Sequence, residues 1–473
     1  MVIPFLLLMI IFPAMFLGLI LALRRHAGSL AVLSGLVNFI ITIYILFESL
    51  ISGSADMTES FRYIPSLGIT LDLRVNLFIL VLLLMSSAVI LVTALSGNIK
   101  REREVLSSAL LVLFQIGATG LFLSGNLFVF FIFWDIGVIA PFFMINVLGS
   151  ANRKKASYKF IVYEIFASAM LLLGIILVYF YSPGHSLNLN QLGTLALQMP
   201  AYIQHYVFFL FFIAFMINMP IFPLHSWLPD AHTEASTQGS MVLSGVLTKF
   251  GGFGMLIIFT SFAIAKAYAP YVAVISAVSA FYAVFLIMQQ TDIKRIVAYT
   301  TIIEMSIIMF SITTLNNFGV YGALYGMLAH GLVVAVMFLS AGVIEHVFFE
   351  RNVNVLRGIA FGEKLTSYVF LAGIFAVTGV PLTASFIADV LMFIGAINAF
   401  GYIGVIPLFS LVLLGGFLYF VINRSFFSTK EHTSAVDFMG FRQKAGYFIL
   451  LALILAFGVM PFIILRMVNY ALI

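Results

Sequence analysis

The sequence contains no cysteine, only two tryptophans and few charged side chains. Without cysteine, the chain forms no disulfide and supplies no thiolate ligand for zinc, an iron–sulfur cluster or covalently attached haem. Charged residues make up 9% of the 473 residues, whereas a soluble domain has about 25%. A soluble protein of this length would need far more polar surface. With 63% apolar residues, the composition instead predicts one all-α bundle that crosses a membrane many times.

Apolar runs of membrane-spanning length recur along the chain. A helix needs about 20 mostly apolar residues to cross a bilayer. By this measure we predict fourteen spans, near residues 3–23, 29–52, 73–95, 105–124, 126–149, 158–181, 201–219, 237–263, 268–288, 293–314, 319–345, 365–396, 402–423 and 445–469. We expect no cleaved signal peptide, because the first run is too long and has neither a basic leader nor a small-residue cleavage site.

Positively charged residues gather in every second loop. One predicted side carries most of the lysines and arginines, namely Arg24, Arg25, Lys100, Arg101, Arg103, Arg153, Lys154, Lys155, Lys159, Lys294, Arg295, Arg351, Arg357, Lys364, Arg424, Lys430, Arg442 and Lys444. The other side carries Arg62, Arg74, Lys266 and Arg466. Basic loops face the cytoplasm, so we predict a prokaryotic inner-membrane protein with both termini on the outer side. This bias explains the net charge of +5 without a nucleic-acid partner.

No stretch between the spans is long enough for a soluble catalytic domain. The longest inner loops are about 346–364 and 424–444. The sequence contains no phosphate-binding glycine loop, and we interpret the glycines of 251–254 as helix-packing residues. We therefore expect no catalytic residue, metal or cofactor in this chain, which can bind, conduct or scaffold within the membrane.

Ionisable residues nevertheless occur at the predicted depth of the membrane core. Lys249 lies near the middle of its span, where a charge costs at least about 2.5–3.5 kcal/mol. Five other ionisable residues are predicted inside spans: Asp135, Glu164, Glu304, His330 and Asp389. Such groups, joined by water, can relay protons. The alternative interpretation is that they only form hydrogen bonds between helices.

Two predicted spans contain helix-breaking sequences. The span 201–219 runs into Met219-Pro220 with a second proline at Pro223, and the span 365–396 contains Pro381. Proline interrupts a helix, and irregular backbone at this depth is tolerated only against protein or a water-filled cavity. The breaks are five spans apart, which inverts the topology and predicts an inverted repeat. We therefore divide the chain into a three-helix segment (1–104), two inverted five-helix repeats, spans 4–8 (105–263) and spans 9–13 (264–423), and a final loop and span (424–473).

The segment 220–236 is polar, rich in proline and too short to span a membrane. Four of its side chains could suggest a metal site: His225, Asp230, His232 and Glu234. We favour a structural turn on the inner side, where proline and charge are ordinary. Farther along, Asp292 precedes Lys294 and Arg295 and predicts the start of a helix.

Two motifs resemble the patterns of one known family. They are residues 223–235, PLHSWLPDAHTEA, and residues 291–299, TDIKRIVAY. Both resemble the antiporter-like, proton-translocating subunits of respiratory complex I, which have relatives in Mrp cation/proton antiporters and membrane-bound hydrogenases. The motif PLHSWLPDAH, residues 223–232, is most similar to that of the M-type, or chain 4, subunit. The resemblance covers essentially the whole chain and implies fourteen spans with inverted halves.

The resemblance implies roles for particular residues. The family's proton-translocation residues in spans five, eight, eleven and the broken span twelve fall, in that order, on Asp135, Lys249, His330 and Asp389. Its central span-seven lysine falls on Asn218, which cannot accept and release a proton near neutral pH. Glu164, Asn218 and Glu304 are secondary candidates for a polar axis. Either the first half is silent, or Lys249 takes over as the partner of Asp135.

Three functions remain open from the sequence. The first is a proton-translocating subunit of a redox-driven pump whose other membrane subunits and peripheral redox arm carry out the electron transfer. The second is a subunit of an Mrp-type cation/proton antiporter. The third is a structural module that retains the fold without pumping.

Overall fold

The computed structural model describes residues 4–53, 55–64, 69–97, 103–428 and 439–468, and it is mostly helical. The longer helices are α1 (Phe5–Ala22), α2 (Ala27–Ser52), α3 (Leu77–Ser96), α4 (Glu104–Leu123), α5 (Leu127–Leu148), α6 (Arg153–Tyr181), α8 (Ala201–Asn218), α11 (Thr248–Ser261), α12 (Ala265–Ile287), α13 (Ile293–Ile312), α14 (Asn317–Phe348), α16 (Lys364–Val377), α17 (Ala384–Phe400), α18 (Phe409–Ser425) and α19 (Phe441–Val459). The shorter ones are α7 (Leu192–Gln198), α9 (Trp227–Glu234), α10 (Thr237–Val242), the π turn η6 (Leu243–Leu247), α15 (Ile359–Gly362) and α20 (Phe462–Val468).

The structure confirms a multi-pass helical protein. Within the described ranges, 13 helices are long and apolar enough to cross a membrane. The predicted span 365–396 is divided into α16 and α17, because the chain leaves the helix between Val377 and Ala384. Helix α18 has only 17 residues. The predicted count of fourteen spans therefore remains a prediction.

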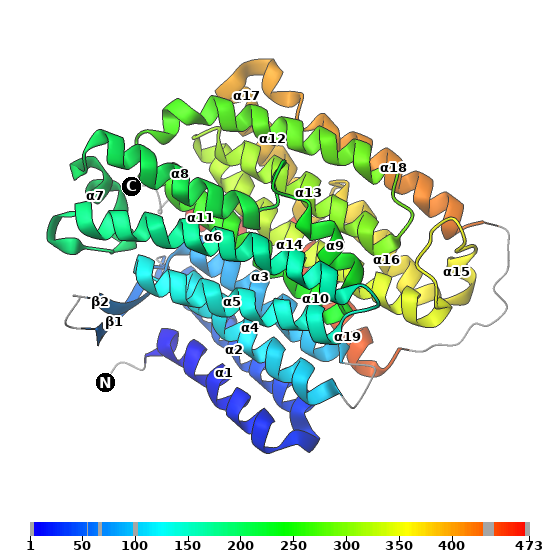
Figure 1. Cartoon of the computed structure of the whole chain (residues 1–473). Coiled ribbons are helices and arrows are strands. Elements are labelled where there is room, and N and C mark those ends of the chain that lie inside the picture. The colour runs from blue at the N-terminus through cyan, green and yellow to red at the C-terminus, as the bar shows by residue number, and fades with distance from the viewer. Residues whose placement is uncertain (1–3, 54, 65–68, 98–102, 429–438, 469–473) are drawn as a thin grey trace.

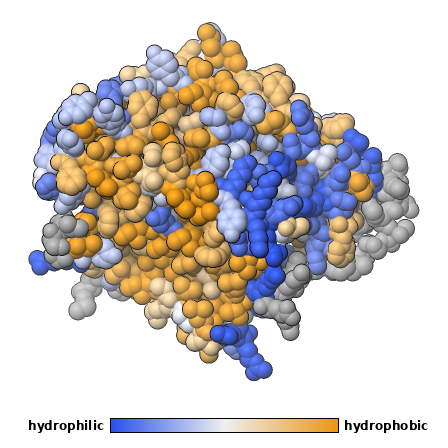
Figure 2. Space-filling view, in the orientation of Figure 1, coloured by the Kyte–Doolittle hydropathy of each residue, from blue (hydrophilic) through white to orange (hydrophobic). Residues whose placement is uncertain are grey.

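The centre of the bundle is formed by α3, the continuous stretch from α10 to α11, α13 and α14. Helix α14 is buried along its whole apolar length, whereas α1, α2, α6 and α12 each leave one face uncovered. The uncovered faces carry large apolar side chains such as Phe47, Val162 and Tyr271. Figure 2 shows a broad hydrophobic band between more hydrophilic ends, as expected for a surface in contact with lipid.

One end of the bundle carries a hairpin that the sequence did not predict. Strands β1 (Met57–Ile64) and β2 (Ile69–Val75) pair antiparallel. Glu59 on β1 accepts hydrogen bonds of 3.0 Å from the backbone N–H groups of Leu6 and Leu7, which fixes the start of α1. On β2, burial lowers the pKa of Arg74 to about 10. The predicted third span thus began too early, since residues 73–75 belong to β2.

The hairpin, α7 and both ends of the chain lie on one side of the molecule, and α15 lies on the other (Figure 1). Three residues of the predicted basic side, Lys100, Arg101 and Lys430, lie outside the described residues, as does the side chain of Arg466.

Residues 227–234 form helix α9, so the interpretation of this segment as a turn is wrong for these residues. The Trp227 indole N–H donates to the carbonyl oxygen of Ile217 at 2.9 Å, and this ties α9 beneath the end of α8. Trp227 and His232 are fully buried. The sequence did not predict this helix because the segment is rich in polar residues and proline. The helix packs against the neighbouring α6 and α13.

The glycines of 251–254 pack helices together, as predicted. A Cβ added to Gly251 would lie 2.6 Å from the backbone oxygen of Phe215 on α8, and one added to Gly254 would collide with the Phe215 ring. Only glycine allows α11 and α8 to approach this closely. The close packing places Lys249 near the break that follows α8.

Candidate functional site

Lys249 is fully buried in the middle of the bundle, and its ammonium group is held by three groups. Its Nζ lies 2.6 Å from the backbone oxygen of Ser244, 3.3 Å from the hydroxyl of Thr248 and 2.5 Å from Nδ1 of His330. The π turn η6 ends two residues before Lys249, and such turns distort the regular helical ladder and occur often at functional sites. The backbone carbonyl of Ser244 accepts a hydrogen bond from Nζ of Lys249, which lies five residues further along the chain.

His330 comes from the middle of α14 and is fully buried. If Lys249 donates to Nδ1, then the ring proton of neutral His330 is on Nε2. Nε2 has no hydrogen-bond partner among the described residues. The ring can therefore accept a proton on one side and release one on the other.

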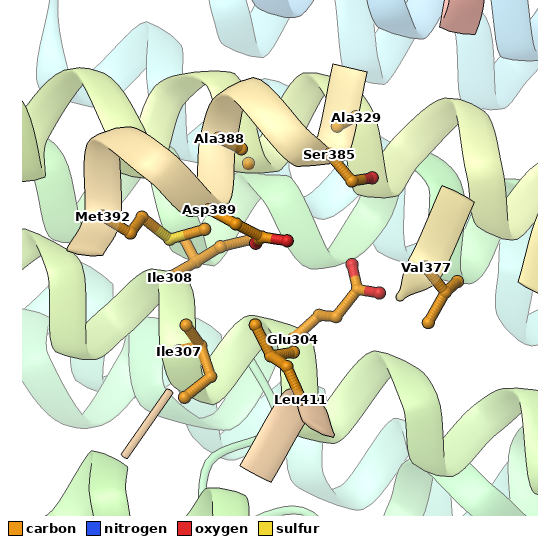
Figure 3. A pocket seen from close by; sticks show the side chains of 11 residues that line it. Glu304, Ile307, Ile308, Ala329, Val377, Ser385, Ala388, Asp389, Met392 and Leu411 are labelled. Carbon is orange, nitrogen blue, oxygen red and sulfur yellow. The ribbon is translucent and has the colours of Figure 1, made fainter. Parts of the chain in front are cut away.

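Glu304 on α13 and Asp389 on α17 share a small cavity (Figure 3). Their carboxylates reach toward one another from opposite sides, and Ser385 lies one helical turn before Asp389. The cavity offers about 10 Å³ to the centre of a water molecule, which is room for about one water. Glu304 also lies within Coulombic range of both Lys249 and Asp389. The four groups His330, Lys249, Glu304 and Asp389 therefore form a file that runs from α11 across α14 and α13 to α17.

His232 is a candidate that the sequence argument assigned to a polar loop. Its ring is fully buried, stacks on Phe338 with the ring centroids 4.5 Å apart, and has no hydrogen-bond partner for either nitrogen among the described residues. It lies within Coulombic range of Lys249 and of Lys294 at the start of α13. His232 therefore lies between the start of α13 and the buried lysine without a hydrogen bond to either. In the sequence, His232 could have been found from its position five residues after Trp227, within one short helix.

The first half of the bundle has a different arrangement. Asp135 on α5 accepts a 2.7 Å hydrogen bond from the hydroxyl of Ser168 on α6. Glu164, fully buried on α6, lies 3.4 Å from the amide nitrogen of Asn218 through both of its carboxylate oxygens. The amide oxygen of Asn218 accepts from the backbone N–H of Gly251 at 2.9 Å. Asn218 therefore links α6 to α11 within residues 105–263, and its own side chain is not titratable.

The predicted site residues fall into two groups. Lys249, His330, Glu304 and Asp389 come together among α11, α13, α14 and α17, and Glu164 and Asn218 come together between α6 and the end of α8. Asp135 is only partly buried, and no hydrogen bond or ion pair joins it to Lys249. The structure therefore offers no direct contact for the hypothesis that Lys249 partners Asp135.

The ends of α6, α9 and α13 are joined by ion pairs. Asp230 on α9 pairs with Lys159 at 2.7 Å and with Arg295 at 3.0 Å. Asp292 caps α13 by accepting from the backbone of Lys294 and Arg295, which confirms the predicted helix start. Burial raises the pKa of the Asp292 carboxyl.

Two of the side chains that suggested a metal site, Asp230 and Glu234, take part in such contacts. Glu234 accepts from the Ser150 hydroxyl at 2.6 Å and from the Asn152 backbone at 2.8 Å. Within the described ranges, no three His, Asp or Glu side chains are grouped to hold a metal. The polar residues of 225–234 thus anchor α9 to its neighbours.

The family model for the transmembrane part of NADH:quinone oxidoreductases and Mrp antiporters matches residues 124–415. The chain belongs to this family. NADH-quinone oxidoreductase subunit M of Rickettsia bellii is 30% identical over 456 residues, which cover 94% of this chain and 91% of that protein. NAD(P)H-quinone oxidoreductase chain 4 1 of a Synechococcus species is 30% identical over 426 residues, covering 86% of this chain and 80% of that protein.

Solved structures share the fold over nearly the whole chain. A chain of respiratory complex I from Thermus thermophilus has a TM-score of 0.89 at 22% identity, covering 98% of this chain and 97% of its own. A chain of an archaeal membrane-bound sulfane sulfur reductase also reaches 0.89, at 21% identity, covering 98% and 96%. A chain of the Mrp complex from a Dietzia species has a TM-score of 0.83 at 19% identity, covering 99% and 97%. Chains of respiratory complex I, of a sulfane sulfur reductase and of an Mrp complex therefore share one fold with this chain.

Proposed function

We propose that this chain is a membrane subunit that conducts or gates proton translocation in a multisubunit, redox-driven ion pump. The observation that carries the proposal is the buried contact between Lys249 and His330, continued by Glu304 and Asp389. Four ionisable groups at this depth are costly to bury. Their arrangement in one file favours a role in proton transfer over a purely structural one. The chain itself binds no redox cofactor in this proposal, and partner subunits transfer the electrons.

The file from Lys249 on α11 to Asp389 on α17 is the part that moves the proton. The Lys249 ammonium donates to Nδ1 of His330, and the imidazolium releases its other proton from Nε2. Glu304 and Asp389 stand at the far end of the file, where a single water can pass a proton between two carboxylates. The neighbouring His232, close to Lys294, supplies a route from the inner surface.

The first half is silent in this proposal. The link between Glu164 and Asn218 has only one titratable group, since the amide of Asn218 neither accepts nor releases a proton near neutral pH. The breaks after α8 and α16 occupy corresponding positions, which supports two inverted halves, residues 105–263 and 264–423. The N-terminal segment 1–104 and the final segment 424–473 flank these halves.

The named relatives favour a redox complex over an antiporter. Subunit M of Rickettsia bellii and chain 4 1 of Synechococcus are both parts of quinone oxidoreductases, whereas the Mrp chain shares only the fold. Other membrane subunits, including further antiporter-like ones, and a peripheral redox arm are the partners in this proposal. Affinity purification of the native complex in mild detergent tests it. Subunits with quinone or metal–sulfur sites support the proposal, and co-purification with cation/proton antiporter subunits alone would replace it with the Mrp-type function.

We infer that the basic ends of the helices face the cytoplasm of a prokaryotic cell and that both termini face outward. The chain has no cysteine, so single cysteines report without background. Lys364 and Lys266 are both exposed at helix starts on opposite sides. An impermeant thiol reagent added to intact cells is expected to label Lys266→Cys and to leave Lys364→Cys unlabelled until the membrane is opened. The reverse pattern would refute this orientation.

A further inference from the structure

A polar cavity lies where α6 begins, and it shares no lining residue with the acid cavity between α13 and α17. It has a volume of about 260 Å³, and its polar lining consists of Asn152, Lys155, Asp230, Thr233, Glu234 and Arg295. Pockets for small ligands start at about 300 Å³, so this one has room for a compact polar group. In the view of Figure 2, a hydrophilic area over α9 and the start of α6 adjoins the hydrophobic band.

Glu234 brings a buried carboxylate to this cavity without a cation to balance it. The residue is 8% exposed. Its Oε2 accepts hydrogen bonds from the Ser150 hydroxyl and the Asn152 backbone, whereas Oε1 accepts none among the described residues. No lysine or arginine in the described ranges forms an ion pair with Glu234, although Asp230 has two such partners. A buried carboxylate without a cation is costly, so its free oxygen favours a positively charged occupant.

Lys155 brings the opposite charge to the same cavity. The residue is exposed, and its ammonium group has no hydrogen-bond or ion-pair partner among the described residues. Lys155 and Glu234 line one cavity and form no ion pair with each other, so the cavity holds two opposite charges apart. Arg295 and the side-chain amide of Asn152 add hydrogen-bond donors. An occupant that matches this lining carries an anion and a cation a short distance apart.

The surface that continues from the cavity is apolar. Tyr158, Val162 and Ile165 follow Lys155 along α6 at intervals of three and four residues, and they are 59%, 65% and 61% exposed. Residues at this spacing lie on one face of a helix, so an apolar stripe starts one turn beyond the lysine. Lysines near the end of a spanning helix reach the level of the lipid head groups. A lipid with its head group in the cavity can therefore lay a hydrocarbon chain along the stripe.

We propose that this cavity binds the head group of phosphatidylethanolamine from the leaflet on the basic side of the membrane. The phosphodiester pairs with Lys155 and Arg295, and the primary ammonium group donates to Oε1 of Glu234. Both charges of the head group are then balanced by charge-assisted hydrogen bonds. The lipid ties together α6, α9 and α13, which supply the lining.

The lining disfavours the other common head groups. The quaternary ammonium of phosphatidylcholine has no N–H to donate, and such groups bind where aromatic rings surround them. None of the described residues that line this cavity is aromatic. Phosphatidylglycerol carries an anion without a cation, so it would leave the Glu234 carboxylate unbalanced and bring a second negative charge close to it.

Lipid binding to the purified full-length chain, measured by native mass spectrometry in mild detergent, tests the proposal. The probes are dioleoyl lipids that differ only in head group: phosphatidylethanolamine, its N-methyl and N,N-dimethyl forms, phosphatidylcholine and phosphatidylglycerol. Wild type is expected to bind phosphatidylethanolamine about tenfold more tightly than phosphatidylcholine or phosphatidylglycerol, the effect of one charge-assisted hydrogen bond. Affinity should fall with each added methyl group, because N–H donors are lost. Equal affinity for all five lipids would overturn the proposal.

Two variants and two matched controls locate the site. Glu234→Gln should remove the preference for phosphatidylethanolamine over phosphatidylglycerol, because glutamine keeps a hydrogen-bond acceptor but carries no charge. Lys155→Gln should weaken phosphatidylethanolamine binding about tenfold, since it removes the cation that pairs with the phosphate. Lys154→Gln replaces an exposed lysine that does not line the cavity, and Glu350→Gln replaces an acid that also accepts two backbone hydrogen bonds. Both controls should bind as wild type does, and unchanged binding by Lys155→Gln would refute the site.

Thermal unfolding separates loss of the site from loss of the fold. Phosphatidylethanolamine should raise the melting temperature of wild type and of both controls, but not that of Glu234→Gln, because a ligand that binds only the folded chain stabilises it. In phosphatidylcholine, Glu234→Gln and wild type should melt at similar temperatures. Water-soluble phosphoethanolamine tests the source of the head group. Equal stabilisation by phosphoethanolamine and by the lipid would replace the lipid with a soluble zwitterion and overturn the assignment.

Discussion

Replacement of Lys249 by alanine or methionine is expected to lower proton translocation about a hundredfold while electron transfer by the complex partly persists. The physical reason is that Lys249 is the only ammonium group in contact with His330 within the described bundle. Its loss leaves Nδ1 of His330 without a donor and interrupts the file before Glu304. Methionine keeps much of the side-chain volume, so that packing around α11 is preserved.

The measurement is proton uptake by sealed vesicles that contain the assembled complex, followed with a pH-sensitive dye, beside the rate of electron transfer. Lys266→Met is the control, since this lysine is exposed at the outer start of α12. The control should pump as wild type does. Full pumping by the Lys249→Met complex would refute the proposed role of the buried lysine.

Replacement of Asn218 by lysine is expected to increase the number of protons moved per electron. The amide nitrogen of Asn218 lies 3.4 Å from both oxygens of Glu164, so an ammonium group in this place can pair with that carboxylate. A lysine would give the first half the titratable base that it lacks. Asn218→Met is the matched control, because it changes the size of the side chain in the same way without adding a charge.

Both Asn218 variants lose the acceptor for the backbone N–H of Gly251, and each is expected to lose about 1–3 kcal/mol of stability for that reason. Only the lysine variant should gain pumping. Depressed pumping would instead indicate repulsion with Lys249 and would favour the hypothesis that Lys249 serves both halves. An unchanged proton-to-electron ratio would favour a structural role for the first half.

The sequence predicted the architecture because insertion into a membrane is a local property. Any window of about 20 apolar residues is long enough to cross, whatever its neighbours are. For the same reason, each ionisable residue inside such a window was visible at once, and Lys249, Glu304, His330 and Asp389 were all found this way. The broken span 365–396 was visible from Pro381, which interrupts a helix wherever it stands.

Tertiary structure decided which of these groups meet. The helices are apolar around most of their circumference, so the sequence does not indicate how each is rotated in the bundle. The contact of Lys249 with His330 joins residues 81 positions apart, on α11 and α14, and the Glu304 and Asp389 pair joins α13 to α17. Helix α9 and its buried His232 were missed because a polar, proline-rich segment becomes helical here only through its packing against α6 and α13.

The family resemblance in the sequence already located the missing lysine at position 218, because a motif fixes a position along the chain. It could not show what Asn218 does there. The side-chain amide of Asn218 forms hydrogen bonds with Glu164 and with the backbone of Gly251. These hydrogen bonds depend on the close approach of α11 to α8 that glycine allows, and the packing of the two helix surfaces decides that approach. The sequence by itself therefore determined which residues are buried and chargeable, and only the packing of the helices decided which of them are close enough to exchange a proton.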